Sequence, residues 1–417
     1  MRSLYTLLIY ITTAHLWVAQ FFSNKMKLFI KGRTQVFDIL GSTLDPTRKS
    51  IWFHCASLGE FEQGVPIIKA VKKKFPDHQI VVSFFSPSGY ENKKNTPLAD
   101  VVVYLPMDTI SNAKRFIQAI DPALVLFIKY EFWPNYLLEL QKENIPILLV
   151  SGLFRKEQLF FKSYGGFMRK ALQSFHHIFV QDKASEALLK KHDLLNVSVS
   201  GDTRFDRVSH QIAQDNSLGF MEQFKQDHLC LVCGSTWAED IAMLLPYLNS
   251  MPDTLRVVVA PHKIEDEKIE NFRKKLKQTS VRYSQHTDED LSQASVLIVD
   301  TIGLLTKIYS YADVAYIGGA MGSTGLHNIL EAATFGVPIV IGKNYDEFPE
   351  AKRLRSLAGL FSVQSSEECS EILNKLMEND SFRNKTGMIA AHFVDQNTGA
   401  TQKIMDYIAR LHSDRLI

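Results

Sequence analysis

Short, almost uninterrupted runs of apolar residues recur along the chain, and they limit the possible folds most. Strands buried on both faces of a sheet have such sequences, whereas half-buried strands alternate apolar and polar residues. Segments with charge on one side and apolar residues at helical spacing, such as 65–75 and 112–120, separate the runs. This alternation predicts the α/β class, a parallel sheet with helices on both faces. The runs of the first half are IWFHC (51–55), IVVSFF (80–85), VVVYL (101–105), ALVLFI (123–128), IPILLV (145–150) and HIFVQ (177–181).

The pattern stops at a polar segment over residues 203–228 and then resumes. Two α/β units joined by a polar crossing predict two Rossmann-like domains that face a cleft, with ligands at the carboxyl ends of the strands. A chain of 417 residues is also long for one core. The later runs are LCLVCGS (229–235), LRVVVAPH (255–262), SVLIVDT (295–301), VAYIGGA (314–320) and VPIVIGK (337–343).

The domain boundaries follow from these patterns. We expect an anchor over residues 1–24, an N-terminal domain over 25–205, a crossing over 206–228, a C-terminal domain over 229–390, and a last helix over 391–417 that packs back on the N-terminal domain.

Charge and cysteine content exclude several classes of protein. Lys and Arg total 47 against 45 Asp and Glu, so no global positive field predicts a nucleic-acid partner. The four cysteines are too few and too scattered for a disulfide framework, which favours a reducing compartment. Cys230 and Cys233 have the spacing of a metal or redox pair, but they lie in an apolar run and no second pair completes a zinc set. We therefore predict buried cysteines and no metal.

The N-terminal segment Leu4–Phe22 carries no formal charge, and about 20 such residues can span a bilayer. Only Arg2 precedes it, whereas basic residues follow it, which predicts a cytoplasmic location for the rest of the chain. We predict a retained membrane anchor that spans or lies in the interface. A buried helix is the alternative, because the segment also holds polar residues: Thr12, Thr13, His15 and Gln20.

The stretch IGGAMGSTGLHNILEAATFGVPIVIG (317–342) predicts a nucleotide site. Its glycines, Gly319 and Gly325 among them, form a loop between a strand and a helix that we expect to begin near Leu326. Free backbone N–H groups at a helix start bind phosphate. Glu331 lies three and four residues after Asn328 and His327, so the three share one face of the expected helix, and Glu331 could reach a ribose diol. The alternative is a structural glycine turn with a capping Asn and a solvated Glu.

The loop lacks the Gly-Lys-Ser/Thr of a P-loop and the spacing of a dinucleotide fingerprint, which argues against ATP hydrolysis and hydride transfer. Two more strand ends should frame the same cleft. After one of them, His262 and Lys263 could contact an anion. After the other, Ile302 to Leu304 offer a backbone turn. Taken alone, each of these two segments has the sequence of an ordinary loop.

Three charged residues of the first half are candidates for catalysis. Glu60 follows the first apolar run, where the dipole of a new helix would keep it ionised and ready to accept a proton. A Glu in the first turn of a helix is also common for structural reasons. Glu131 follows another strand among aromatic residues, at the same cleft. Arg204 lies beside the crossing, where its charge could meet a leaving phosphate.

Together these stretches resemble the 3-deoxy-D-manno-octulosonic acid (Kdo) transferases of lipopolysaccharide assembly, which are membrane-anchored glycosyltransferases of the two-Rossmann GT-B type. The motifs run in order through nearly the whole chain. They are the anchor, ASLGE (56–60), SPSG (86–89), YEFWPN (130–135), SGLFR (151–155), GDTRFD (201–206), GST (234–236), APHK (260–263), DTIGLL (300–305) and GGAMGSTGLHNILEAATFG (318–336).

The resemblance implies a CMP-Kdo donor, a lipid A precursor as acceptor, and inversion by direct displacement at the cytoplasmic face of the inner membrane. It implies that Glu60 is the general base and that Glu131 and Arg204 stabilise the transition state. No cofactor or metal is expected, because a helix start and Arg204 can neutralise the leaving monophosphate. The implied CMP site comprises Pro261, His262, Lys263, Ile302, Gly303, Leu304, Gly319, Gly325, Asn328, Ile329, Leu330 and Glu331.

The chain departs from the family pattern at several positions. Arg204 and Trp237 stand where Lys and His are usual, His262-Lys263 where Arg-His is usual, and Leu304 where Glu is usual. The alternatives are another GT-B enzyme, such as a UDP-sugar transferase or a nucleotide-sugar 2-epimerase, and a non-catalytic membrane-bound nucleotide-binding module.

Overall fold

The computed structural model describes residues 1–129, 131–414 and 416–417, and these residues form two compact units. The first unit comprises Met1–Arg207 together with Thr398–Ile417, and the second comprises Val208–Asn397. Each unit has its own sheet, as two separate series of apolar runs would require.

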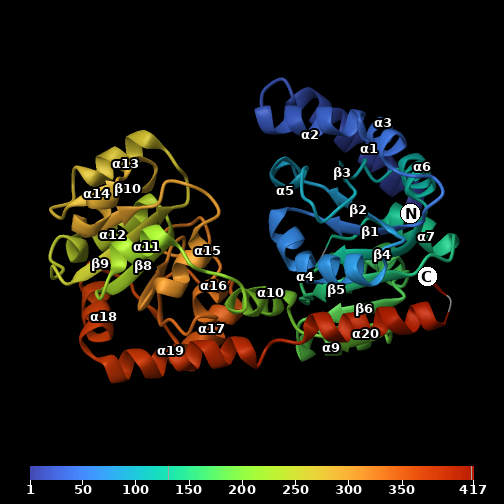
Figure 1. The fold of residues 1–417 in the computed structure, drawn as a ribbon. Coiled ribbons are helices and arrows are strands. Elements are labelled where there is room, and N and C mark those ends of the chain that lie inside the picture. The colour runs from blue at the N-terminus through green and yellow to red at the C-terminus, as the bar shows by residue number, and fades with distance from the viewer. Residues whose placement is uncertain (130, 415) are drawn as a thin grey trace. The chain divides into compact units, whose positions relative to one another are not determined.

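The first unit is built on a parallel sheet of seven strands in the order β3-β2-β1-β4-β5-β6-β7 (Figure 1). The order places β1 and β4 side by side, so the loops that follow them leave the same edge of the sheet. The strands are β1 (Ser50–Cys55), β2 (Gln79–Phe84), β3 (Val101–Tyr104), β4 (Pro122–Ile128), β5 (Ile147–Gly152), β6 (His177–Val180) and β7 (Val197–Val199).

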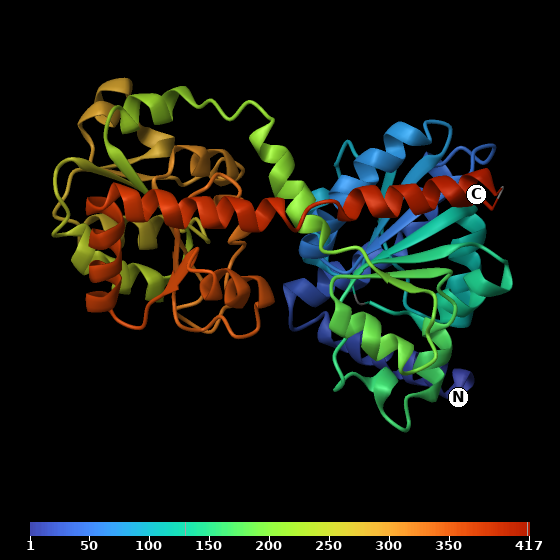
Figure 2. The same ribbon diagram turned by 90° about the horizontal axis from the view of Figure 1, so that it is seen from below.

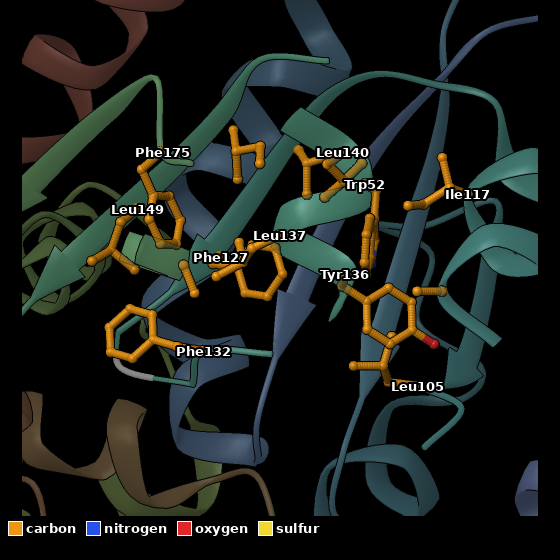
Figure 3. Close-up of a cluster of buried hydrophobic side chains, with 14 of the residues drawn as sticks. Trp52, Leu105, Ile117, Phe127, Phe132, Tyr136, Leu137, Leu140, Leu149 and Phe175 are labelled. Carbon is orange, nitrogen blue, oxygen red and sulfur yellow. The ribbon is translucent and has the colours of Figure 1, made fainter. Parts of the chain in front are cut away.

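Helices cover both faces of this sheet, which explains the continuous apolar runs. Trp52 of β1 points into one core, whereas its neighbours Ile51 and Phe53 point into the other. Figure 3 shows the first core, where Trp52, Phe127 and Leu149 of three strands meet Tyr136, Leu137 and Leu140 of α7. The helices are α1 (Arg2–Ala19), α2 (Asn24–Thr34), α3 (Val36–Thr43), α4 (Leu58–Lys74), α5 (Pro87–Lys93), α6 (Ile110–Ile120), α7 (Pro134–Lys142), α8 (Gly166–Leu172), α9 (Lys183–Lys190) and α20 (Ala400–Ser413), with α10 (Thr203–Ile212) at the junction of the two units.

The chain returns to the first unit in its last helix, α20, drawn in red in Figure 2. Ile404 and Ile408 of α20 are buried in the same core as Phe61 and Ile68 of α4. Asp206 accepts hydrogen bonds from the backbone N–H of Thr401, at 2.7 Å, and from its hydroxyl, at 2.8 Å. The start of α20 is thus held at its N-terminus by a carboxylate, where the helix dipole favours negative charge.

The second unit has its own parallel sheet of seven strands, in the order β10-β11-β9-β8-β12-β13-β14. Cys230 and Cys233 lie in β8 and are buried free thiols, as predicted. The strands are β8 (Leu229–Thr236), β9 (Leu255–Pro261), β10 (Ser280–Arg282), β11 (Val296–Ile298), β12 (Val314–Ile317), β13 (Ile339–Ile341) and β14 (Leu360–Ser362). The helices are α11 (Gly219–Lys225), α12 (Ala238–Leu248), α13 (Asp266–Arg273), α14 (Asp288–Gln293), α15 (Leu305–Ile308), α16 (Leu330–Ala333), α17 (Pro349–Ser356), α18 (Ser366–Glu378) and α19 (Asp380–Asp395).

The predicted anchor segment forms α1. No helix in the part of the chain described above is both long enough and apolar enough to cross a membrane. Polar side chains at the start of α1 attach it to the first unit: Arg2 pairs with Glu139 of α7 at 2.6 Å, and the Tyr5 hydroxyl donates to Asp108 at 2.8 Å. The apolar side chains along the helix are mostly exposed, namely Leu4, Leu7, Leu8, Tyr10, Ile11, Trp17 and Val18.

Candidate active site

Glu60 lies in the first turn of α4, directly after the carboxyl end of β1. Its side chain is only 8% exposed, and the Ser57 hydroxyl donates a hydrogen bond to it. The positive end of the helix dipole favours the ionised carboxylate at this position. Glu60 is therefore a fixed, partly desolvated carboxylate, which suits a proton acceptor.

Glu131 follows β4, the strand beside β1, so it leaves the same edge of the sheet as Glu60. Burial raises the pKa of the Cys55 thiol, and the negative charges of Glu60 and Glu131 raise that pKa further. Cys55 is the last residue of β1. Both carboxylates therefore act electrostatically on the end of this strand. Of the aromatic neighbours predicted for Glu131, Tyr130 lies outside the described residues.

His54 of β1 contacts both Glu131 and Trp133. Its Nε2 lies 3.1 Å from Oε2 of Glu131 and 3.0 Å from Nε1 of Trp133, which donates to it. Its Nδ1 lies 2.9 Å from the Ser83 hydroxyl, which also accepts a hydrogen bond of 2.7 Å from the Trp52 indole. His54 is itself buried. The position of Glu131 therefore depends on a hydrogen-bonded chain that extends into the sheet.

Arg204 is oriented by Asp202. The Asp202 carboxylate accepts from Nε of Arg204 at 2.9 Å and pairs with its Nη2 at 2.8 Å. Burial on its own would raise the pKa of Asp202, but the charge and hydrogen bonds of Arg204 outweigh it and lower that pKa. The Gln63 amide donates to the same carboxylate at 3.0 Å. Because Gln63 lies three residues after Glu60 on α4, this one helix helps to position both candidates.

The glycine loop of the second unit depends on backbone conformations that glycine adopts most easily. Gly319 and Gly325 have φ angles of +96° and +94°. A Cβ atom on Gly319 would lie 2.1 Å from the carbonyl oxygen of Gly325, so another side chain would force the loop open. Position 319 therefore requires glycine, because the backbone of the loop passes too close to it for a larger residue.

Asp240 of α12 organises this loop from within the unit. Its carboxylate accepts hydrogen bonds from the backbone N–H of Trp237 at 2.8 Å, from that of Gly319 at 2.9 Å, and from the Tyr316 hydroxyl at 2.8 Å. Asp240 is fully buried. Three donors offset the cost of burying a carboxylate, and the carboxylate thereby joins the loops after β8 and β12.

The helix after the glycine loop begins later than predicted. The structure begins α16 at Leu330, whereas the sequence analysis expected a helix from about Leu326. The Asn328 side chain accepts from the backbone N–H of Leu330 at 3.2 Å, an interaction that competes with helix formation over the preceding residues. His327 and Asn328 therefore do not share a helical face with Glu331, and that prediction was wrong.

Asn328 and Glu331 nevertheless contact each other. The Asn328 amide donates to Oε1 of Glu331 at 3.2 Å, and the Thr306 hydroxyl donates to Oε2 at 3.0 Å. Thr306 belongs to α15, which follows the predicted turn at Ile302 to Leu304. In that turn Gly303 has a φ angle of +98° and Ile302 is 91% exposed. The turn and the Asn328–Glu331 pair thus belong to one connected region of the second unit.

The end of β9 and the loop after it bring Pro261, His262 and Lys263 to the same region. The backbone N–H of His262 donates to the carbonyl of Thr236 at 2.9 Å, which ties this loop to the end of β8. The His262 ring lies 4.4 Å from the His327 ring, centroid to centroid. The residues of the predicted nucleotide site that come from three loops are therefore neighbours within the second unit.

The sequence also matches known proteins. Residues 30–207 match the family model described as 3-deoxy-D-manno-octulosonic-acid transferase (kdotransferase). A 3-deoxy-D-manno-octulosonic acid transferase of Haemophilus influenzae is 25% identical over 386 residues, which cover 89% of each chain. One of Chlamydophila psittaci is 28% identical over 320 residues, 73% of this chain and 72% of that one. The resemblance to Kdo transferases is confirmed. The chain is a glycosyltransferase.

A solved structure shows the same fold. The UDP-GlcNAc 2-epimerase of Neisseria meningitidis bound to UDP-GlcNAc aligns with a TM-score of 0.61 at 16% identity, and the alignment covers 87% of this chain and 100% of that one. At this identity the likeness concerns the fold alone. The predicted α/β class with two Rossmann-like domains is confirmed.

Several residues of these sites were missed or undervalued from the sequence. His54 and Asp240 lie within or beside apolar runs, where a polar residue had no visible partner. His327 was seen only as a neighbour of Asn328, and Trp237 only as a departure from the family pattern. A polar residue inside a buried strand or at the start of a helix is the one signal that could have identified His54 and Asp240.

Proposed function

We propose that this enzyme transfers Kdo from CMP-Kdo to a sugar hydroxyl of a lipid A precursor in lipopolysaccharide biosynthesis, with inversion and with Glu60 as general base. The observation that carries the proposal is the buried position of Glu60 in the first turn of α4, where the Ser57 hydroxyl donates a hydrogen bond to it. The match of residues 30–207 to Kdo transferases supports it, because Glu60, Glu131 and Arg204 all lie within that range.

The proposed reaction transfers one proton, forms one bond and breaks another. Glu60 takes the proton of the acceptor hydroxyl. At the same time the hydroxyl oxygen forms a bond to the anomeric carbon of Kdo. The bond from that carbon to the phosphate oxygen of CMP breaks, and the bonding electrons leave with CMP. Fixed donors stabilise such developing charge without reorganising. Arg204, held by Asp202 and about a quarter exposed, is suited to that role.

We assign the donor nucleotide to the second unit. The backbone of the glycine loop and Lys263 suit a phosphate, and the Asn328–Glu331 pair suits a ribose diol. Pro261 with His262, the turn at Ile302 to Leu304, and Ile329 with Leu330 complete the proposed CMP site. We expect no metal ion, so transfer should persist in a chelator.

We also propose that α1 attaches the enzyme to the cytoplasmic face of the inner membrane. The exposed apolar side chains of α1 suit insertion into a lipid surface. The lysines of α2, Lys25, Lys27 and Lys31, would favour a surface that is anionic. Sedimentation with anionic vesicles tests this. Replacing Leu7, Leu8 and Ile11 by Ser should reduce binding strongly, whereas Leu195→Ser, at an exposed site on the same unit, should not. Equal binding of both variants would contradict the proposal.

A mass-resolved assay of the purified protein with freshly generated CMP-Kdo and a tetraacylated lipid A precursor tests the transfer itself. We expect products heavier by whole Kdo units. No product from folded protein that binds CMP would overturn the proposal. Conversion of UDP-GlcNAc to its 2-epimer by the same sample would identify the competing activity.

A further inference from the structure

Three aromatic side chains meet where the strands β8, β9 and β12 end: Trp237, His262 and His327. The indole N–H of Trp237 donates to Nε2 of His327 at 3.1 Å, and the two rings lie within 16° of parallel. The His262 ring covers this pair, with its centroid 4.5 Å from that of Trp237 and 4.4 Å from that of His327. The rings therefore form one compact cluster, which we name the indole–imidazole cluster.

The hydrogen bond fixes the tautomer of His327. An indole N–H can only donate, so Nε2 must be the unprotonated nitrogen and the hydrogen of the neutral ring lies on Nδ1. Burial lowers the pKa of His327 to about 4, and the neighbouring His262 lowers it as well. At neutral pH the ring is therefore uncharged, as the hydrogen bond requires.

Trp237 is itself held in place. Its backbone N–H and that of Gly319 both donate to the buried Asp240 carboxylate. The Lys263 ammonium lies 5.3 Å from the centre of the indole ring, within range of a cation–π interaction. The indole is thus fixed to the glycine loop that His327 terminates.

Nδ1 of His327 makes no hydrogen bond to any residue that the structure describes, and its ring is only partly buried. A donor N–H remains beside a loop whose geometry suits a phosphate. We propose that Trp237 is a positioning residue that holds His327 as a neutral Nδ1–H donor toward a phosphate oxygen of the nucleoside monophosphate part of the donor. The identity of this ligand rests on the proposed function, whereas the tautomer does not.

The tautomer can be measured on the full-length protein without ligand. In protein labelled with ¹⁵N-histidine, long-range proton–nitrogen correlations separate protonated from unprotonated ring nitrogens, and the spectrum of His327→Asn identifies the His327 signals. We expect a protonated Nδ1 and an unprotonated Nε2. Trp237→Phe, which keeps an aromatic ring but removes the N–H, should give a mixture of tautomers. A mixture in the wild type, or an unchanged tautomer in Trp237→Phe, would overturn the positioning role.

Binding of CMP, measured by calorimetry, tests the ligand. An Asn amide nitrogen replaces Nδ1 and a Gln amide nitrogen replaces Nε2, so His327→Asn should bind within about threefold of wild type and His327→Gln about tenfold more weakly. Trp237→Phe should weaken binding about fivefold, the effect of one neutral hydrogen bond. Equal affinities of the Asn and Gln variants would overturn the phosphate contact. Absence of CMP binding by a wild type with the expected tautomer would instead overturn the proposed donor.

Discussion

Nε2 of His54 lies 3.1 Å from Oε2 of Glu131 and, at the same time, accepts a hydrogen bond of 3.0 Å from the Trp133 indole. A ring nitrogen carries either one hydrogen or one lone pair, so it cannot serve both groups fully at once. His54 therefore couples the position of Glu131 to that of Trp133, and both belong to the motif that the sequence analysis singled out.

This coupling predicts a catalytic effect of His54, a residue inside the sheet. His54→Ala should lower kcat by about 10- to 100-fold, because a carboxylate displaced by about 1 Å loses much of its effect. His54→Gln, whose amide nitrogen can replace Nε2, should retain more activity than His54→Asn. Steady-state kinetics with a thermal-unfolding control measure this. Wild-type rates in a folded His54→Ala variant would contradict the role.

Arg204 is expected to act through its charge. Arg204→Ala should lower kcat/KM by about 10²- to 10³-fold, as for the loss of one fixed donor in a transition state. Arg204→Lys keeps the charge but not the two-point contact with Asp202, so it should stay within about tenfold of wild type. Comparable losses in the two variants would show that geometry, rather than charge, is needed there.

The glycine loop predicts a specific loss of stability. Gly319→Ala places a Cβ atom against the Gly325 carbonyl at a positive φ angle, so it should lower the free energy of unfolding by more than about 1 kcal/mol. Gly219→Ala is a matched control in the same unit, since no atom lies within 4 Å of its Cβ position, and it should be neutral or stabilising. Urea unfolding monitored for both variants gives the comparison, and equal stability would be inconsistent with the loop geometry.

His327 predicts a pH dependence of stability. Because its pKa is lowered to about 4 in the folded state, the unfolded chain binds a proton that the folded chain does not between pH 4 and about 6.5. Stability should therefore fall as the pH decreases through this range. His327→Asn, which cannot titrate, should have a smaller decrease in its urea midpoint. Identical pH profiles would show that His327 titrates normally, despite its neighbours His262 and Lys263.

Sequence patterns predict most of the strands of both sheets, because strands buried on both faces leave continuous apolar runs. Three strands were missed, β7, β10 and β14; each is three residues long and lies at the edge of its sheet, where less apolar sequence is needed. The start of α16 was misplaced because a local hydrogen bond of Asn328 overrides helical spacing. Contacts such as that of Trp237 with His327, 90 positions apart, depend on tertiary structure and leave no local pattern.

Single-turnover transfer from CMP-Kdo by Glu60→Gln tests whether Glu60 is the base for Kdo transfer. Glu62→Gln is the control, because Glu62 lies on the same helix but pairs with Lys93 and Arg207. We predict a rate at least about 10²-fold below wild type for Glu60→Gln, with unchanged CMP affinity and a Glu62→Gln rate within a few fold of wild type. A Glu60→Gln rate within a few fold of wild type would show that Glu60 is not the base.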